Sequence, residues 1–248
     1  MTEKSLKWYR QLADKKSRLE TGCFLVEGQK AIRQIAASQP DAITEIISVE
    51  ETPESLRNYP SRIINASEFG YISSVQTPQG ILALVKAPED IYFPTLPKET
   101  GTHILLLEDI QDPGNVGTLI RTAAALRYDG VILTENCADP LNPKTVQASA
   151  GTVLSLWLRR TAQYLEIVKS LKQDDHKIMA AEVKGSDTPV MLTRNKKLVL
   201  ALGNEATGLS QPLLGMADYR VRIPMMPEKA ESLNVAACGA ILMYVSKN

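Results

Sequence analysis

The sequence predicts an α/β protein with a doubly wound, mostly parallel sheet in its C-terminal part and a smaller α/β domain before it. Two observations predict this fold class. After residue 101, short apolar runs alternate with segments of helical periodicity, as in parallel strands covered by helices on both faces. Residues 87–101 (APEDIYFPTLPKETG) hold three prolines and show no periodicity, which indicates a linker. We therefore expect two domains, residues 1–86 and 102–248.

The elements of the first domain follow from its periodicity. Helical spacing of apolar residues marks two segments, and clusters of β-branched and apolar residues mark three strands. The expected helices are Leu6–Leu19 and Gln29–Ala37, and the expected strands are Phe24–Val26, Ile43–Val49 and Ile81–Lys86.

The second domain shows a stricter alternation of the same two patterns. Its expected strands are His103–Glu108, Gly130–Thr134, Leu154–Leu158, Lys177–Ala181, Lys197–Leu202 and Tyr219–Ile223, and its expected helices are Asn115–Leu126, Gln163–Leu171 and Leu233–Val245. Ligands of such sheets bind beyond the carboxyl ends of the strands, so we expect the site in the loops after Glu108, Leu202 and Ile223.

Composition excludes several classes of protein. The 248 residues are 44% hydrophobic, and 28 Lys+Arg balance 28 Asp+Glu, which fits a globular chain rather than a disordered one. The longest apolar runs are too short to cross a bilayer, and residues 1–10 lack the pattern of a signal peptide. We expect a cytoplasmic protein that does not enter membranes. RNA binding by a chain of zero net charge would depend on a local basic patch.

The potential metal ligands are few and dispersed. The three cysteines and two histidines are Cys23, Cys137, Cys238, His103 and His176. None of them has the spacing of a zinc site or of a disulfide framework, so we expect no metal and a reducing compartment. Two isolated histidines also argue against histidine-based catalysis.

The first motif is DPGNVGTLIRTA at residues 112–123. Its first three residues are typical of a turn, and Asn115 is expected to cap the following helix. Arg121 lies off the buried stripe of that helix among small neighbours, so its guanidinium can reach back over the helix start, where backbone N–H groups favour an anion. An ordinary surface arginine explains this segment equally well.

The second motif is LGNEATGLS at residues 202–210. Its glycine spacing imitates a phosphate-binding loop, but Leu209 stands where such a loop needs lysine, which excludes a nucleoside triphosphatase. The two glycines allow the backbone to approach a ligand closely, with Glu205 at the edge of the sheet. A plain strand-to-helix turn is the alternative.

The third motif joins IPM at residues 223–225 to SLNVAA at residues 232–237. Ser232 is a plausible helix cap. Core packing accounts for the alanines of this segment, but it does not account for the polar Ser232 and Asn234 so close to an apolar strand end.

In order and spacing, the three motifs resemble those of SpoU/TrmH-type RNA 2′-O-ribose methyltransferases of the SPOUT superfamily. The N-terminal part resembles the accessory substrate-binding domain of this family, which has a ribosomal-protein-like RNA-binding fold. The resemblance implies methyl transfer from S-adenosylmethionine to a ribose 2′-hydroxyl of structured RNA, with ribosomal RNA favoured over tRNA. It also implies a homodimer and a trefoil knot through which the C-terminal segment is threaded. Sequence physics alone would not predict the knot.

The resemblance also assigns residues to roles. The polar catalytic set is Asn115, Arg121, Glu205, Ser232 and Asn234; the cofactor contacts are Leu202, Gly203, Ile223, Met225 and Leu233; the RNA contacts are Lys15, Lys16, Arg18 and Arg121. Because arginine stays protonated, we favour a role for Arg121 in gripping the phosphate beside the target ribose. Glu205 either orients Arg121 or takes the proton. A non-catalytic RNA-binding or ribosome-assembly factor that retains the fold is the alternative function.

Overall fold

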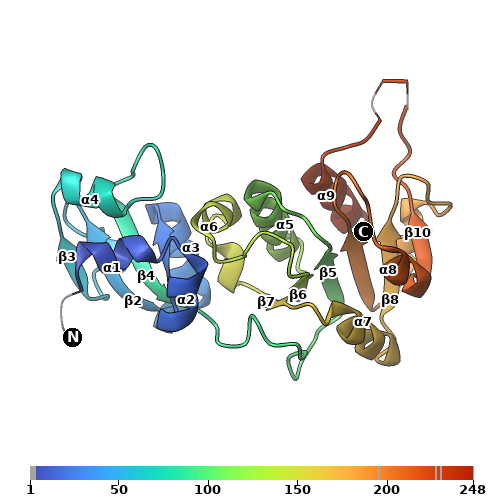
Figure 1. Ribbon diagram of the computed structural model, residues 1–248, viewed down its shortest axis with the longest axis horizontal. Coiled ribbons are helices and arrows are strands. Elements are labelled where there is room, and N and C mark those ends of the chain that lie inside the picture. Colours follow the sequence, from blue (N-terminus) through green and yellow to red (C-terminus); the bar gives the residue numbers. More distant parts are fainter. Residues whose placement is uncertain (1–3, 195, 227, 230, 248) are drawn as a thin grey trace. The chain divides into compact units, whose positions relative to one another are not determined.

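The computed structural model describes residues 4–194, 196–226, 228–229 and 231–247. The chain forms two compact units, and the order of their elements can be followed in Figure 1. The first unit contains residues 1–89 and 139–155, and the second contains residues 90–138 and 156–248. Each unit is described by itself.

The first unit is built on a mixed four-stranded sheet of order β1-β4-β2-β3. Strand β4 runs antiparallel to both β1 and β2, whereas β2 and β3 are parallel. The strands are β1 (Cys23–Glu27), β2 (Ile43–Ser48), β3 (Ser61–Ile63) and β4 (Ile81–Lys86), and the helices are α1 (Leu6–Gln11), α2 (Lys15–Thr21), α3 (Gln29–Ser38), α4 (Ala66–Ile72) and α6 (Pro143–Ser149). Tyr9 of α1 and Phe69 of α4 are buried together against Leu82 and Leu84 of β4, which forms the core of this unit.

The expected helix Leu6–Leu19 is wrong as a single element. Helix α1 ends at Gln11, and α2 begins after Asp14. The Arg18 guanidinium donates hydrogen bonds to the carbonyl oxygens of Leu12 (3.0 Å) and Ala13 (2.7 Å). These carbonyls, which a continuous helix would bond internally, find their donors in a side chain instead.

Residues 139–155 pack into the first unit although they lie in the second half of the sequence. Arg18 Nη2 lies 3.5 Å from Asp139 Oδ1, and these side chains are only 2% and 9% exposed. Gly151 has φ +85°, and a Cβ there would lie 2.3 Å from the carbonyl oxygen of Ala31, so only glycine fits. The compact units therefore differ from the expected domains in this segment.

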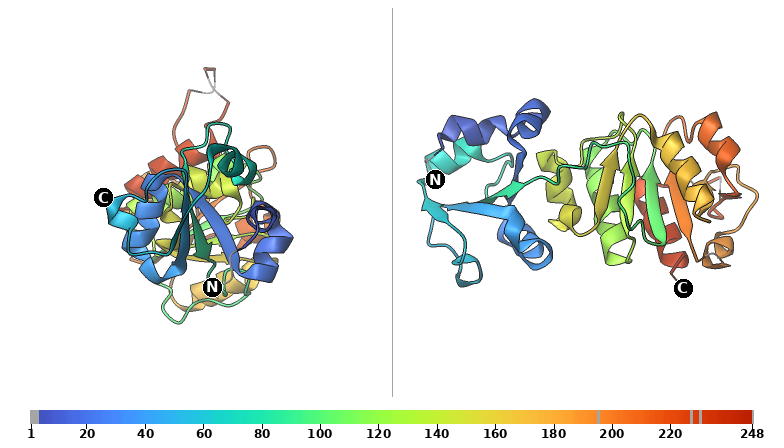
Figure 2. Two further views of the ribbon diagram at one scale, coloured as in Figure 1. Left: turned by 90° about the vertical axis from the view of Figure 1, so that its left-hand side faces the viewer. Right: turned by 90° about the horizontal axis from the view of Figure 1, so that it is seen from below.

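The second unit is built on a six-stranded sheet in which every neighbouring pair is parallel, in the order β10-β8-β9-β5-β6-β7. Figure 2 shows helices on both faces of this sheet, which confirms the doubly wound architecture. The strands are β5 (His103–Leu107), β6 (Gly130–Leu133), β7 (Trp157–Arg160), β8 (Lys177–Ala181), β9 (Leu198–Leu202) and β10 (Tyr219–Val221), and the helices are α5 (Pro113–Ala125), α7 (Tyr164–Gln173), α8 (Gln211–Met216) and α9 (Val235–Val245). The expected strand Leu154–Leu158 is misplaced, because Thr152–Leu154 is a 3₁₀ turn.

Alternation along the strands distributes the core between the two faces. On one face, Ile104 and Leu106 of β5 join the buried side chains of α7 and α8. On the other face, α9 crosses α5 and β9 at Gly239, where a Cβ would lie 2.4 Å from Leu119 Cδ2 and 2.7 Å from Leu202 Cδ1. This glycine brings the start of α9 close to the carboxyl ends of the strands.

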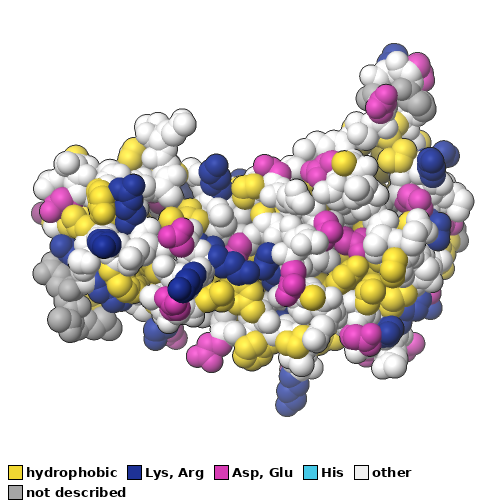
Figure 3. Space-filling view, in the orientation of Figure 1, with side chains coloured by type: hydrophobic (Ala, Val, Ile, Leu, Met, Phe, Trp, Pro, Cys, Tyr) yellow, Lys and Arg dark blue, Asp and Glu magenta, His cyan; other side chains and the backbone are white. Residues whose placement is uncertain are grey.

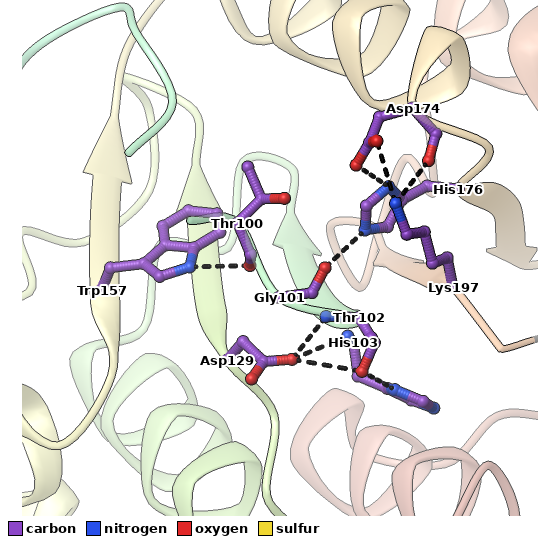
Figure 4. A network of polar contacts seen from close by, with 9 residues as sticks. All are labelled: Thr100, Gly101, Thr102, His103, Asp129, Trp157, Asp174, His176 and Lys197. Carbon is purple, nitrogen blue, oxygen red and sulfur yellow. Dashed lines mark hydrogen bonds and ion pairs between the residues drawn. The ribbon is translucent and has the colours of Figure 1, made fainter. Parts of the chain in front are cut away.

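The end of the linker is fastened to the edge where the strands begin (Figure 4). Trp157 Nε1 donates to the carbonyl of Thr100 at 3.0 Å, and Asp129 Oδ2 accepts from the backbone N–H of His103 at 2.9 Å. The ring of His176 is buried, which lowers its pKa, and its Nε2 lies 3.2 Å from the carbonyl oxygen of Gly101. Both histidines thus lie at the edge opposite to the one where ligands of such sheets bind.

None of the helices in the described ranges has the length and apolarity needed to cross a membrane.

Candidate active site

A cavity of about 450 Å³ opens beyond the carboxyl ends of β8 and β9. Its wall includes the whole loop from Leu202 to Leu209, together with Leu233. A Cβ on Gly203 would lie 2.4 Å from the carbonyl carbon of Gly208, so this loop closes on itself only with glycine at residue 203. A smaller cavity of about 90 Å³ adjoins it and shares the lining residues Ser232 and Leu233.

The five expected cofactor contacts come together in these two cavities. Leu202 and Gly203 line the larger one, Ile223 and Met225 line the smaller one, and Leu233 lines both. They come from β9 and from the segment after β10. The two cavities together have the size of a small-molecule site, and their walls mix apolar side chains with polar ones, so these residues fit a bound nucleoside cofactor.

Three of the five expected catalytic residues form a chain of hydrogen bonds. Asn115 Nδ2 donates to Glu205 Oε1 at 2.7 Å, and Asn234 Nδ2 donates to Asn115 Oδ1 at 3.1 Å. A carboxylate only accepts, so Glu205 fixes the amide orientation of Asn115, and Asn115 then fixes that of Asn234. Residues 107 and 202 are paired in the register of β5 and β9, so the segments that lead to Asn115 at the start of α5 and to Glu205 leave the sheet side by side.

The helix caps differ from those expected, and this difference explains how the series of hydrogen bonds forms. Asp112, not Asn115, caps α5: its Oδ1 accepts from the backbone N–H of Asn115 at 2.7 Å. The Asn115 side chain is thereby available to Glu205. At α9 the cap is Asn234, whose Oδ1 accepts from Ala236 N at 2.9 Å, rather than Ser232. Ser232 instead lines both cavities.

Arg121 lies apart from this series of hydrogen bonds. Its side chain is exposed on α5, on the same face of the helix as Thr118, which precedes it by three residues and is also exposed. Among the residues that the structure describes, none forms a hydrogen bond or ion pair with the Arg121 guanidinium. Its charge and all its donors are therefore available to an anion from outside the chain.

The sequence analysis missed the residues that hold the loop after β9 in place through hydrogen bonds. Glu108, only 4% exposed, accepts from the backbone N–H of Ser210 at 2.7 Å and from the Tyr164 hydroxyl. Burial, and then Glu108, raise the pKa of Tyr164 to about 12. The Asp109 carbonyl accepts from Asn204 Nδ2 at 2.9 Å. A charged residue at the end of an apolar strand was the available signal for Glu108.

The expected RNA contacts divide into two groups. Lys15 and Lys16 are exposed on α2. The Arg18 guanidinium is buried and engaged with Asp139 and two carbonyl oxygens, so it stabilises the first unit and is not placed to contact RNA. No group of three or more potential metal ligands is found within the described ranges.

Comparison with known proteins agrees with the site. Residues 102–244 match the SpoU rRNA methylase family, and residues 3–83 match the MRM3-like substrate binding domain. The chain belongs to the SpoU rRNA methylase family. It is an RNA 2′-O-methyltransferase that uses S-adenosylmethionine.

Individual relatives extend over nearly the whole chain. The 23S rRNA (guanosine(2553)-2′-O)-methyltransferase RlmP of Bacillus subtilis strain 168 is 31% identical, with 96% of this chain and 94% of the relative covered. A structure of an AdoMet-bound rRNA methyltransferase from Sinorhizobium meliloti is 28% identical with a TM-score of 0.80, covering 98% and 93%. A TrmH-family structure from Porphyromonas gingivalis is 27% identical with a TM-score of 0.84, covering 100% and 98%.

Proposed function

We propose that this SpoU-family enzyme methylates the ribose 2′-hydroxyl of one nucleotide of ribosomal RNA in the cytoplasm. The observation that carries the proposal is the hydrogen-bonded series Glu205–Asn115–Asn234, which joins the loop after β9 to the starts of α5 and α9 and includes a carboxylate that also lines the larger cavity. Ribosomal RNA is favoured over tRNA because the B. subtilis relative is named for 23S rRNA and the matched family is described as rRNA methylases.

The residues act by binding and alignment, which in-line methyl transfer requires more than it requires a metal. S-adenosylmethionine supplies the methyl group when it is bound. The loop at Gly203 and the apolar wall at Ile223 and Leu233 hold it. Asn115 holds the Glu205 carboxylate, which accepts the proton of the 2′-hydroxyl. Arg121 remains protonated and pairs with the phosphate next to the target ribose.

Substitution of the polar residues tests these roles. In Asn115→Ala and Arg121→Ala, we expect methyl transfer to fall about 100-fold or more, the loss seen when one fixed polar group at a reaction centre is removed. Binding of S-adenosylmethionine in calorimetry should stay nearly unchanged. Thr118→Ala, on the same exposed face of α5, is the matched control.

The substrate for this assay is total rRNA from a strain that lacks the protein, and the methylated nucleotide is mapped on the product. Unchanged turnover of either variant at saturating RNA would contradict the assignment. Cofactor binding without methyl transfer by the parent chain would favour the non-catalytic RNA-binding factor instead.

We also propose that the enzyme is a homodimer. Ala237, Ile241 and Tyr244 are exposed on one side of α9, and Ile241 and Tyr244 are 41% and 61% exposed. A second copy of this helix is the occupant we infer for this apolar stripe. Ile241→Glu should convert a dimer to a monomer in sedimentation or light-scattering experiments; a parent chain that is monomeric at micromolar concentration would refute the dimer.

We propose further that the C-terminal segment is threaded into a trefoil knot. The loop after β9 and Leu233 line the larger cavity, and Ile223, Met225 and Leu233 line the smaller one beside it, which supports this path. An experimentally determined structure with a continuous trace from residue 198 to residue 245 tests it.

We assign RNA affinity to the N-terminal domain expected from the sequence, residues 1–86. Lys15 and Lys16 are its exposed basic residues on α2, and phosphate contacts of this kind weaken with salt. The double variant Lys15→Gln/Lys16→Gln should bind rRNA more weakly and with a smaller salt dependence than the parent. Equal affinity and equal salt dependence would show that these lysines do not contact RNA.

A further inference from the structure

The first unit contains a cavity of about 280 Å³, which the proposed reaction does not use. It lies between α1 and α4. Tyr9, Arg10 and Ala13 form one side, Gly70 to Ser74 form another, and Leu25 and Pro143 complete the wall. The lining thus combines the aromatic ring of Tyr71 with one cation, Arg10, a combination that suits a planar ligand carrying negative charge.

A stacked pair stands at this cavity. The Arg10 guanidinium carbon lies 4.5 Å from the centroid of the Tyr71 ring, and Tyr71 is 43% exposed. Within the described part of the chain, no residue forms a hydrogen bond or ion pair with the Arg10 guanidinium. One side of the guanidinium faces the Tyr71 ring, while its N–H edge has no partner among the described residues.

Two further cations lie on or beside α1. Lys7 and Arg10 lie on α1, which contains no acidic residue, and Lys4 Nζ lies 4.1 Å from the ring of Trp8. In the space-filling view, Lys and Arg side chains lie next to hydrophobic side chains over the part of this unit formed by α1 and α4 (Figure 3). Cations interleaved with aromatic rings are the usual surface for unpaired nucleotides.

We propose that this cavity binds one unpaired nucleotide of the substrate RNA, with its base stacked on the Arg10–Tyr71 pair and its phosphate held by the N–H edge of Arg10. Stacking tolerates every base, so the subsite detects an unpaired base next to a backbone rather than a particular sequence. The proposal rests on the proposed function only in taking RNA as the ligand. It adds a contact remote in sequence from the residues that bind the cofactor.

Two pairs of variants test the subsite in binding assays with rRNA from a strain that lacks the protein. Tyr71→Leu should weaken binding roughly 5- to 150-fold, the range for loss of one base–aromatic stack, whereas Tyr71→Phe should bind like the parent. Arg10→Gln should weaken binding and reduce the slope of log affinity against log salt concentration by about one, as expected for the loss of one phosphate contact. Arg33→Gln is the matched control, since Arg33 is exposed on α3 and bonds Ser55 instead.

Ultraviolet cross-linking of the parent chain to the same RNA gives a readout that does not depend on folding of a variant. The cross-link should map to the tryptic peptide 63–86, which contains Tyr71. Parent-like affinity of Tyr71→Leu and Arg10→Gln, or a cross-link that avoids this peptide, would overturn the subsite. If the parent bound rRNA through this peptide but transferred no methyl group, the subsite would stand and the proposed function would fail.

Discussion

Replacement of Arg18 by methionine separates a structural role from RNA binding. The change removes the guanidinium but keeps a long apolar stem in a position that is 3% exposed. It removes the guanidinium that lies 3.5 Å from the Asp139 carboxylate, itself 9% exposed, and it frees the carbonyls of Leu12 and Ala13.

The expected cost follows from this burial. Removing one partner of a buried ion pair costs about 3–5 kcal/mol, because the other charge stays desolvated. Leu141 N still donates to Asp139 Oδ1 at 2.8 Å, so we expect the lower end, about 3 kcal/mol. For a unit of about 100 residues, this corresponds to a fall in Tm of roughly 12–24 °C. The double variant Arg18→Met/Asp139→Leu should recover part of the loss.

Urea unfolding followed by tryptophan fluorescence measures this cost. The chain has two tryptophans, Trp8 in the first unit and Trp157 in the second, so Trp157→Phe leaves a single reporter in the unit that contains Arg18. Lys16→Met on the same helix is the control, since the Lys16 side chain is 86% exposed and its loss should change the free energy of unfolding by less than about 0.5 kcal/mol.

The refuting result is specific. If Arg18→Met unfolded within about 1 kcal/mol of its parent while its affinity for rRNA fell, Arg18 would be an RNA contact, as the sequence resemblance implied, and the structural role assigned to it here would be wrong.

Three further outcomes are expected. Gly203→Ala should abolish S-adenosylmethionine binding in calorimetry, because its Cβ would lie 2.4 Å from the backbone of Gly208; parent-like affinity would show that the loop is not the cofactor wall. Glu108→Leu should lower the free energy of unfolding by roughly 1–3 kcal/mol by leaving Ser210 N without an acceptor, whereas Glu108→Gln, which can still accept, should be nearly neutral in urea titrations. Chelation by EDTA should not inhibit methyl transfer when RNA folding is held constant; inhibition that zinc reverses would reveal a metal requirement.

Much of the second unit could be predicted because its strands are continuous apolar runs. A parallel strand buried on both faces, such as Leu198–Leu202, is recognisable from composition alone. Once strands alternate with helices, their carboxyl ends share an edge, so the motifs at Asn115 and Glu205 could be expected to meet. The Asn115–Glu205 hydrogen bond confirms this expectation.

The remaining errors have local physical causes. The short elements β3, α6 and α8 have three to seven residues, too few for a period to stand out. The cap of α5 was predicted wrongly because Asp112 and Asn115 are both residue types that cap helices. Which of them does so depends on Glu205, which is distant in sequence and binds the Asn115 side chain. The break after α1 depends on Arg18 and could not be seen from apolar spacing.

The inclusion of residues 139–155 in the first unit has a consequence for how the protein is made. During synthesis, the N-terminal sheet can form once residue 86 has emerged, but Asp139 and Gly151 are then still to be translated. Until they arrive, the charge of Arg18 and the α3 backbone at Ala31 lack the groups that pack on them. The N-terminal unit is therefore completed only after the start of the catalytic half has been synthesised. A chimera that exchanges residues 1–86 between relatives would need to carry a matching 139–155 segment.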